Sequence, residues 1–122
     1  MTNTNPPSEI FVVDDDPSIR LLLAAWLESG GFRVRTFEGG RGLLRALKKH
    51  RPHAVILDVM MPDLDGVRTL ELIREKGWDV PVLVLSAKET VETAVRCMRR
   101  GAFDYLLKPV EREEVLRILE RV

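Results

Sequence analysis

The chain has little of several features that define whole classes of protein. A single cysteine, Cys97, excludes an internal disulfide and is compatible with a reducing cytoplasm. No apolar run approaches the length of a membrane span, and the N-terminus lacks the basic and apolar segments of an export signal. The 19 Lys and Arg residues balance the 19 Asp and Glu residues, so the charge gives no reason to expect direct binding to nucleic acid or to an anionic membrane. These absences predict a cytoplasmic protein whose function depends on local chemistry.

The length of 122 residues suits one domain and is too short for two. Residues 1–8 are polar with two prolines, so we expect a flexible leader before a domain at 9–122. The chain stops inside an apolar helical pattern, which suggests that the domain is a fragment of a longer protein.

Strands and helices are expected to alternate along the domain. Apolar runs typical of buried strands occupy residues 10–13, 54–57 and 82–85. The segments 33–37 and 104–107 are charged or short, which favours edge strands. Five strands joined by right-handed helical crossovers predict an α/β fold, a flavodoxin-like doubly wound (βα)5 parallel sheet with strand order 2-1-3-4-5.

One helix is expected over about residues 90–100, and its apolar spacing predicts which face packs on the sheet. Cys97 lies off this stripe and has no His or redox partner in the sequence, so no role is assigned to it. The predicted inner face consists of Val91, Ala94, Val95 and Met98.

Polar residues follow four of the predicted strands. Asp14 and Asp15 come after the first strand and Asp58 ends the third, while Ser86 and Lys108 follow the fourth and fifth. The carboxyl ends of parallel strands meet at one edge of a sheet. Carboxylates about 4 Å apart there would repel by about 4 kcal/mol a pair at an effective dielectric near 20, so a cation is needed. Oxygen donors of this kind favour Mg²⁺, and the lysine and hydroxyl suit a phosphoryl group.

Each of these residues also has a simpler interpretation. Asp16 is most simply a helix N-cap, because Pro17 follows it. Asp63 and Asp65 suit a turn and a cap. Taken alone, a lysine or a serine at a strand end is usually a solvated side chain. The coincidence of Asp-Asp, Asp, Ser and Lys on neighbouring strand ends favours a functional site, with Asp58 as nucleophile or metal ligand.

Several short motifs occur together in the chain. They are Val12-Val13-Asp14-Asp15, Ile56-Leu57-Asp58 with Met61-Pro62 and Asp65-Gly66, Leu85-Ser86-Ala87, Gly101-Ala102, Asp104-Tyr105 and Lys108-Pro109. With these motifs, the sequence from Ile10 to Val122 resembles the receiver domain of bacterial two-component response regulators. Ser86 stands where many members of that family have threonine.

The resemblance implies a phosphoacceptor site. Asp58 would accept a phosphoryl group from the histidine of a sensor kinase. Asp14, Asp15 and Asp58 would hold Mg²⁺ together with the backbone carbonyl of Met60, and Lys108 would contact the phosphoryl group. The domain would promote this transfer, and slow dephosphorylation, on itself; it would be a signalling switch and not an enzyme acting on other substrates.

The resemblance also implies how the signal leaves the site. Ser86 would bind a phosphoryl oxygen and Tyr105 would be the aromatic switch residue, which alters the surface of the fourth helix, fifth strand and fifth helix. Met60 and Lys88 would modulate the lifetime of the phosphoryl group. An output domain, DNA-binding or an enhancer-binding ATPase, and a phosphorylation-dependent homodimer are the expected partners besides the kinase. The Lys108-Pro109 peptide is similar to one that is cis in the family.

Three alternatives stay open at this point. A phosphohydrolase of the haloacid dehalogenase type would use the Asp14-x-Asp16 pattern, with Mg²⁺ and Asp14 as nucleophile. A flavodoxin-like FMN carrier fits the fold, although the acidic turn would repel a phosphate. A receiver-like module that is not phosphorylated would act only through binding. Stable phosphorylation of Asp58 without ester turnover would distinguish the receiver from all three.

Overall fold

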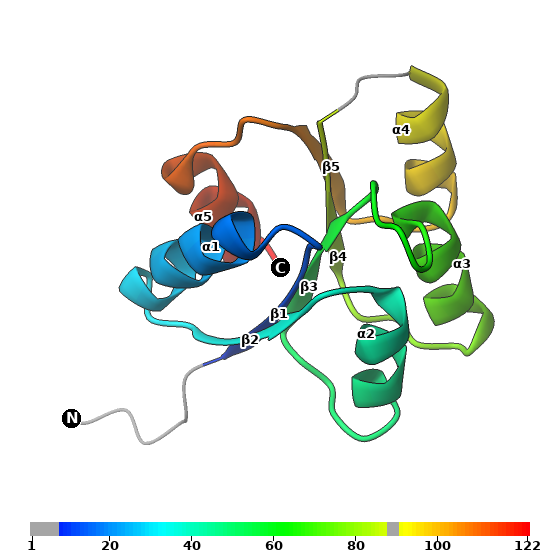
Figure 1. Cartoon of the computed structure of the whole chain (residues 1–122), viewed down its shortest axis with the longest axis horizontal. Helices are drawn as coiled ribbons and strands as arrows, with labels where there is room; N and C mark the ends of the chain where they lie inside the picture. The colour runs from blue at the N-terminus through cyan, green and yellow to red at the C-terminus, as the bar shows by residue number, and fades with distance from the viewer. Residues whose placement is uncertain (1–7, 88–90) are drawn as a thin grey trace.

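The computed structural model describes residues 8–87 and 91–122, which form a parallel five-stranded sheet between two layers of helices (Figure 1). The strands are β1 (Glu9–Val13), β2 (Arg33–Phe37), β3 (Ala54–Asp58), β4 (Val82–Ser86) and β5 (Asp104–Leu107). The helices are α1 (Pro17–Ser29), α2 (Gly40–Leu47), α3 (Gly66–Glu75), α4 (Val91–Arg99) and α5 (Arg112–Glu120). Of these, no helix in the described ranges is long and apolar enough to cross a membrane.

The strand order is β2-β1-β3-β4-β5, as the apolar and charged runs predict. The central strands β3 and β4 are buried along their whole length, whereas β2 exposes Arg33, Arg35 and Thr36 at one edge. Charged side chains on an edge strand keep water on that edge and discourage pairing with another sheet. The order places the switch point between β1 and β3, where polar residues follow both strands.

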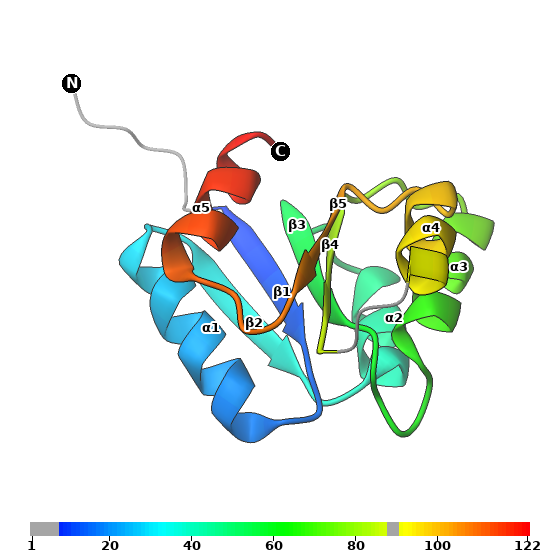
Figure 2. The same ribbon diagram turned by 90° about the horizontal axis from the view of Figure 1, so that it is seen from above.

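Two separate apolar cores hold the layers together. Helices α1 and α5 lie on one side of the sheet and α2, α3 and α4 on the other, as both views show (Figures 1 and 2). Phe11 and Val13 of β1 point into the core under α2, α3 and α4, and Ile10 and Val12 point into the other. Alternate residues of β1 therefore fix the helices on both faces.

The first turns of two helices are capped by aspartates next to the strand ends. The side chain of Asp16 accepts a hydrogen bond from the Ser18 backbone N–H at 2.9 Å, and Pro17 opens α1. Asp65 accepts from the Arg68 backbone N–H at 2.8 Å and caps α3. The capping interpretation of both aspartates is confirmed, which leaves Asp14, Asp15 and Asp58 as the acidic residues to explain.

The predicted inner face of α4 is wrong for its three larger residues, whereas Ala94 is half-buried. Val91 is 78% exposed, and Val95 and Met98 are 40% and 47% exposed. Cys97, which the sequence pattern placed off the apolar stripe, is fully buried in the core shared with α2 and α3. A cysteine behaves as a small hydrophobic residue in a core. The helix therefore packs through the small side chain of Cys97 and leaves its larger apolar side chains on the surface.

Candidate functional site

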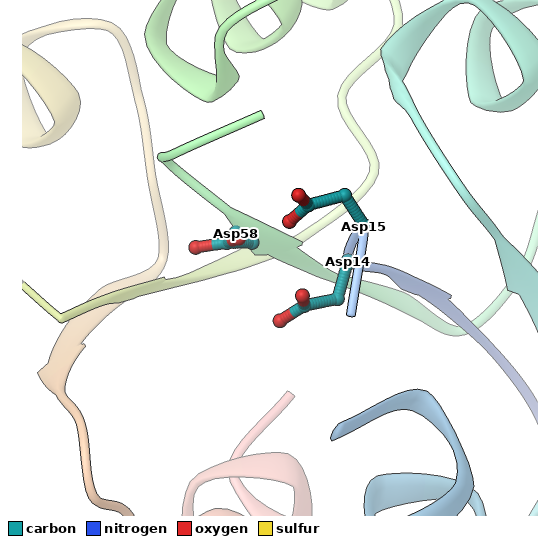
Figure 3. Close-up of side chains that lie close together, drawn as sticks. All are labelled: Asp14, Asp15 and Asp58. Carbon is teal, nitrogen blue, oxygen red and sulfur yellow. The ribbon is translucent and has the colours of Figure 1, made fainter. Parts of the chain in front are cut away.

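The ends of β1 and β3 bring three carboxylates together. Val13 of β1 pairs with Leu57 of β3, so the residues that follow, Asp14 and Asp58, are side by side at the carboxyl edge. Figure 3 shows Asp14, Asp15 and Asp58 reaching into one space from the two strand ends. One carboxylate oxygen from each residue lies within 4.8 Å of those of the other two. The cluster expected from the sequence is present.

Burial differs among the three carboxylates. Asp14 and Asp58 are 1% and 3% exposed, whereas Asp15 is exposed. Ionised carboxylates that water does not reach are costly unless cations or hydrogen-bond donors compensate them. The buried pair therefore needs partners that the protein, or a bound cation, must supply.

Lys108 is the protein's own cation in the cluster. Its Nζ lies 2.9 Å from Oδ2 of Asp14 and 3.4 Å from Oδ1 of Asp58. Burial lowers the pKa of Lys108, but its contacts with Asp14 and Asp58 outweigh burial, so the net pKa is raised. The lysine is charged at neutral pH and bridges the two strand ends, closer to Asp14 than to Asp58. The Lys108–Pro109 peptide that follows is cis, as the resemblance implies.

Asp58 is the carboxylate whose ionisation the fold opposes. Burial, and then the charge of Asp14, raise the pKa of Asp58, while Lys108 and the backbone N–H of Met60 lower it to a lesser extent. That N–H donates to Oδ1 of Asp58 at 3.3 Å. Two opposing influences on one buried carboxylate in a cluster are typical of functional sites.

The other expected residues that the structure describes lie at the end of β4, in β5 and just after β3. Ser86 is 1% exposed at the end of β4, and its backbone carbonyl accepts a hydrogen bond from Lys108 N at 2.7 Å. Tyr105 of β5 is partly buried and packs against the core under α2, α3 and α4. The side chain of Met60 is exposed. Lys88 lies outside the described residues.

Sequence reasoning missed Arg20. Its guanidinium Nη1 donates to the backbone carbonyl of Asp14 at 2.6 Å, and its side chain is 16% exposed. The sequence does carry a signal, because Arg20 is a charged residue between apolar Ile19 and Leu21, one turn beyond the Asp16 cap. Without the backbone path, that position cannot be distinguished from a solvated arginine.

The donor set fits a divalent cation that prefers oxygen ligands. Three carboxylates and one lysine leave net negative charge at the edge, and each carboxylate offers an oxygen to a common centre. Among the described residues, these three aspartates form the only group of three or more candidate metal ligands. A hard cation such as Mg²⁺ keeps several waters and takes its protein ligands mainly from carboxylate oxygens.

The chain matches known proteins over almost its whole length. The family model described as the response regulator receiver domain matches residues 10–120. The chain is 44% identical over 110 residues to response regulator MprA of Mycolicibacterium vanbaalenii, covering 90% of the chain and 48% of that protein. It is 38% identical over 112 residues to the DNA-binding transcriptional regulator NtrC of Proteus hauseri, covering 92% and 24%.

Solved structures agree with the sequence matches. Chemotaxis protein CheY4 of Vibrio cholerae superimposes with a TM-score of 0.88 at 30% identity, covering 95% of this chain and 98% of that one. This chain thus covers almost the whole of CheY4, but only about a quarter of NtrC and about half of MprA. The chain belongs to the receiver domain family of two-component response regulators.

Proposed function

We propose that this domain accepts a phosphoryl group on Asp58 from the phosphohistidine of a sensor kinase. The observation that supports this most directly is the buried Asp58 carboxylate, held with two further carboxylates and Lys108 at one edge of the sheet. Such a set would favour transfer of a phosphoryl group because catalysis of that reaction depends on positioning and charge neutralisation.

The transfer would be a substitution at phosphorus. A carboxylate oxygen of Asp58 forms the new O–P bond, the P–N bond to the kinase histidine breaks, and the imidazole nitrogen keeps the electron pair and takes a proton. Lys108 lies 3.4 Å from Oδ1 of Asp58 and would move its contact towards the incoming phosphoryl oxygens. A cation already beside the nucleophile offsets the charge that gathers there.

Mg²⁺ is the metal we assign to the cluster, held by Asp14, Asp15 and Asp58 with the backbone carbonyl of Met60. When bound, it would neutralise charge on the transferring phosphoryl oxygens. Two contacts within the chain hold the carboxylate oxygens in place without the cation. Lys108 contacts Asp14, and the backbone N–H of Met60 donates to Asp58.

Phosphorylation would be sensed by Ser86 and Tyr105. The added negative charge would attract the hydroxyl of Ser86 at the end of β4, and Tyr105 of the neighbouring strand β5 would turn inward in response. The surface formed by α4, β5 and α5 would carry the change. Large apolar side chains are already exposed there, namely Val91, Val95, Met98, Phe103 and Leu107.

We propose that the output domain belongs to a longer protein. The chain spans about half or less of the curated relatives it matches, and one of those is a DNA-binding transcriptional regulator. We propose residues 9–122 as the receiver of such a regulator, joined to a transcriptional output domain, DNA-binding or an enhancer-binding ATPase, with phosphorylation favouring a homodimer. Met60 and Lys88 would set the phosphoryl lifetime, with exposed apolar Met60 hindering the attacking water.

The deciding experiment is labelling with acetyl phosphate and MgCl₂, followed by intact mass and by the stability of the label at alkaline pH. We expect one acid-stable, alkali-labile phosphoryl group on the wild-type chain and none on Asp58→Asn. Asp63→Asn is the matched control, because Asp63 is an exposed aspartate in the next loop. Undiminished labelling of the Asp58 variant at another carboxylate would overturn the assignment.

The same experiment distinguishes the proposed receiver from a receiver-like module that is not phosphorylated. The family match favours the receiver over the haloacid dehalogenase and FMN-carrier interpretations, since neither of those belongs to the receiver family. A receiver that acts without phosphorylation would give no label on the wild-type chain at any MgCl₂ concentration.

A further inference from the structure

We propose that Arg20 is a positioning residue for the metal site: by holding the Asp14–Asp15 peptide, it sets how close the two carboxylates lie. The inference rests on the proposed function, because it concerns the same Mg²⁺ site. It assigns a task to a side chain that lies outside the cluster and contacts none of the three carboxylates.

Arg20 reaches backwards along the chain from the first full turn of α1. Its backbone N–H donates to the carbonyl of Asp16 at 3.1 Å, which fixes the residue in the helix. Its side chain extends past the helix start, and Nη1 donates to the carbonyl of Asp14 at 2.6 Å. That carbonyl belongs to the peptide unit joining Asp14 to Asp15. One guanidinium thus holds the single peptide between two of the candidate ligands.

All four polar groups of Asp14 have partners when this contact is included. Its N–H donates to the Phe37 carbonyl at 3.2 Å, Oδ1 accepts from Asp16 N–H at 2.9 Å, and Oδ2 accepts from Lys108 at 2.9 Å. The Arg20 bond occupies the carbonyl and so completes the set. Without that bond, rotation of the Asp14–Asp15 peptide would be free to alter the direction of the Asp15 side chain, which is exposed and outside the core.

The charge of Arg20 is placed unusually for an ion-pairing residue. Its nearest carboxylate contact is Glu38 at 3.8 Å, and the Glu38 side chain is 87% exposed, so this pair is weak. Arg68, by contrast, lies on the surface and pairs with Glu75 at 2.9 Å. A guanidinium withdrawn from water for a backbone carbonyl loses more hydration than it recovers from that one neutral partner. The bond from Arg20 to the turn that carries Asp14 and Asp15 gives a reason for the burial of its guanidinium.

Groups that orient ligands from outside a metal site ordinarily affect affinity more than fold. Loss of the Arg20 bond would remove no member of either core, since both cores are built from apolar side chains of other residues. The expected consequence is therefore weaker Mg²⁺ binding by about 10-fold, in the range seen when such outer groups are removed.

The test compares Arg20→Ala and Arg20→Lys with wild type in the 122-residue chain. Mg²⁺ affinity is measured by calorimetric titration with MgCl₂, and the rate of labelling by acetyl phosphate is measured across MgCl₂ concentrations. Arg68→Ala is the matched control, because it removes an arginine that pairs on the surface of α3. Glu38→Gln removes the weak ion pair and keeps the bond to Asp14.

We expect Arg20→Ala to raise the half-saturating MgCl₂ concentration about 10-fold while the rate at saturating MgCl₂ stays near wild type. Arg20→Lys retains a charged donor and should recover part of the loss, and Glu38→Gln and Arg68→Ala should match wild type. A general structural defect would instead lower the saturated rate and the unfolding temperature together. Wild-type Mg²⁺ affinity in Arg20→Ala overturns this inference alone, whereas a wild-type chain that neither binds Mg²⁺ nor labels overturns the proposed function.

Discussion

Replacing Asp58 by Asn should make the metal-free protein more stable, because the substitution removes a charge that the fold holds at a cost. At an effective dielectric near 20, Asp14 within 4.8 Å repels Asp58 by about 3.5 kcal/mol. Lys108 at 3.4 Å attracts it by about 5 kcal/mol on the same basis. These two interactions leave about 1.5 kcal/mol in favour of the charge.

Two further effects reverse that balance. Asp15 is exposed, so its repulsion of Asp58 is reduced to about 1 kcal/mol at the dielectric of water. Taking the Asp58 carboxylate out of water costs several kcal/mol, and the carboxylate is 3% exposed. The net agrees in sign with the raised pKa of Asp58, for which burial is the largest cause. We expect Asp58→Asn to be stabilised by about 2 kcal/mol, or roughly 8 °C in Tm.

The pH dependence follows from the same raised pKa. The pKa of the Asp58 carboxyl is higher in the folded than in the unfolded chain. The folded protein therefore loses stability as the pH rises from the ordinary pKa of 3.8 through the raised pKa. The advantage of Asp58→Asn should therefore be full at neutral pH and shrink on acidification towards pH 4. Saturating MgCl₂ should also shrink it, since ligand binding stabilises the wild type by about 2.7 kcal/mol at 100 times Kd.

Urea unfolding monitored by circular dichroism, at several pH values and with or without MgCl₂, measures these differences directly. Asp63→Asn again serves as the control for a loop aspartate that lies outside the cluster and should show no such pattern. A stabilisation of Asp58→Asn that is independent of both pH and MgCl₂, or a destabilisation at neutral pH, would refute the electrostatic argument.

Two further predictions concern packing and burial. Gly66→Ala should lower the free energy of unfolding by about 3 kcal/mol in urea titration, because a Cβ there would collide with the carbonyl of Asp58 and lie 2.6 Å from Cα of Val59. Gly42→Ala, whose Cβ would lie 3.6 Å from Phe37, should instead stabilise by about 0.5–1 kcal/mol through helix propensity, and equal effects at the two glycines would contradict the packing argument. Cys97 should react with a thiol reagent only as fast as the protein opens, since it is fully buried and burial raises the pKa of its thiol. Rapid stoichiometric labelling of the folded chain, followed by absorbance, would contradict this burial.

The sheet order and the acidic edge could be predicted from sequence because both depend on short-range patterns. Continuous apolar runs identify strands covered on both faces, and Arg33 and Arg35 identify an edge. Once the order is known, residues that immediately follow parallel strands must meet. Asp14 and Asp58 are therefore brought together by topology alone, without any detail of side-chain packing.

The face of α4 and the contact of Arg20 could not be predicted, and for different reasons. Hydrophobicity marks Val91, Val95 and Met98 as inner residues, yet the helix approaches the sheet through Cys97. Which stripe is buried depends on the space between neighbouring helices and on any partner that covers the other stripe. Arg20 depends on the path of the chain between β1 and α1, and hydrogen bonds from a side chain to a backbone carbonyl leave no periodic pattern.

The mispredicted helix and the acidic edge have a common physical consequence. α4 carries apolar side chains that the domain itself does not cover, and the acidic edge carries a carboxylate whose ionisation the domain does not favour. Each is a local departure from the most stable arrangement, and such departures concentrate where a protein binds or reacts. Asp58 pairs with Leu85 of β4, and β4 pairs with β5, so on the proposed function a change in charge at Asp58 would act first on Ser86 and Tyr105 in these two strands. The stability given up at both places would then allow a small change in charge at Asp58 to shift the surface of α4.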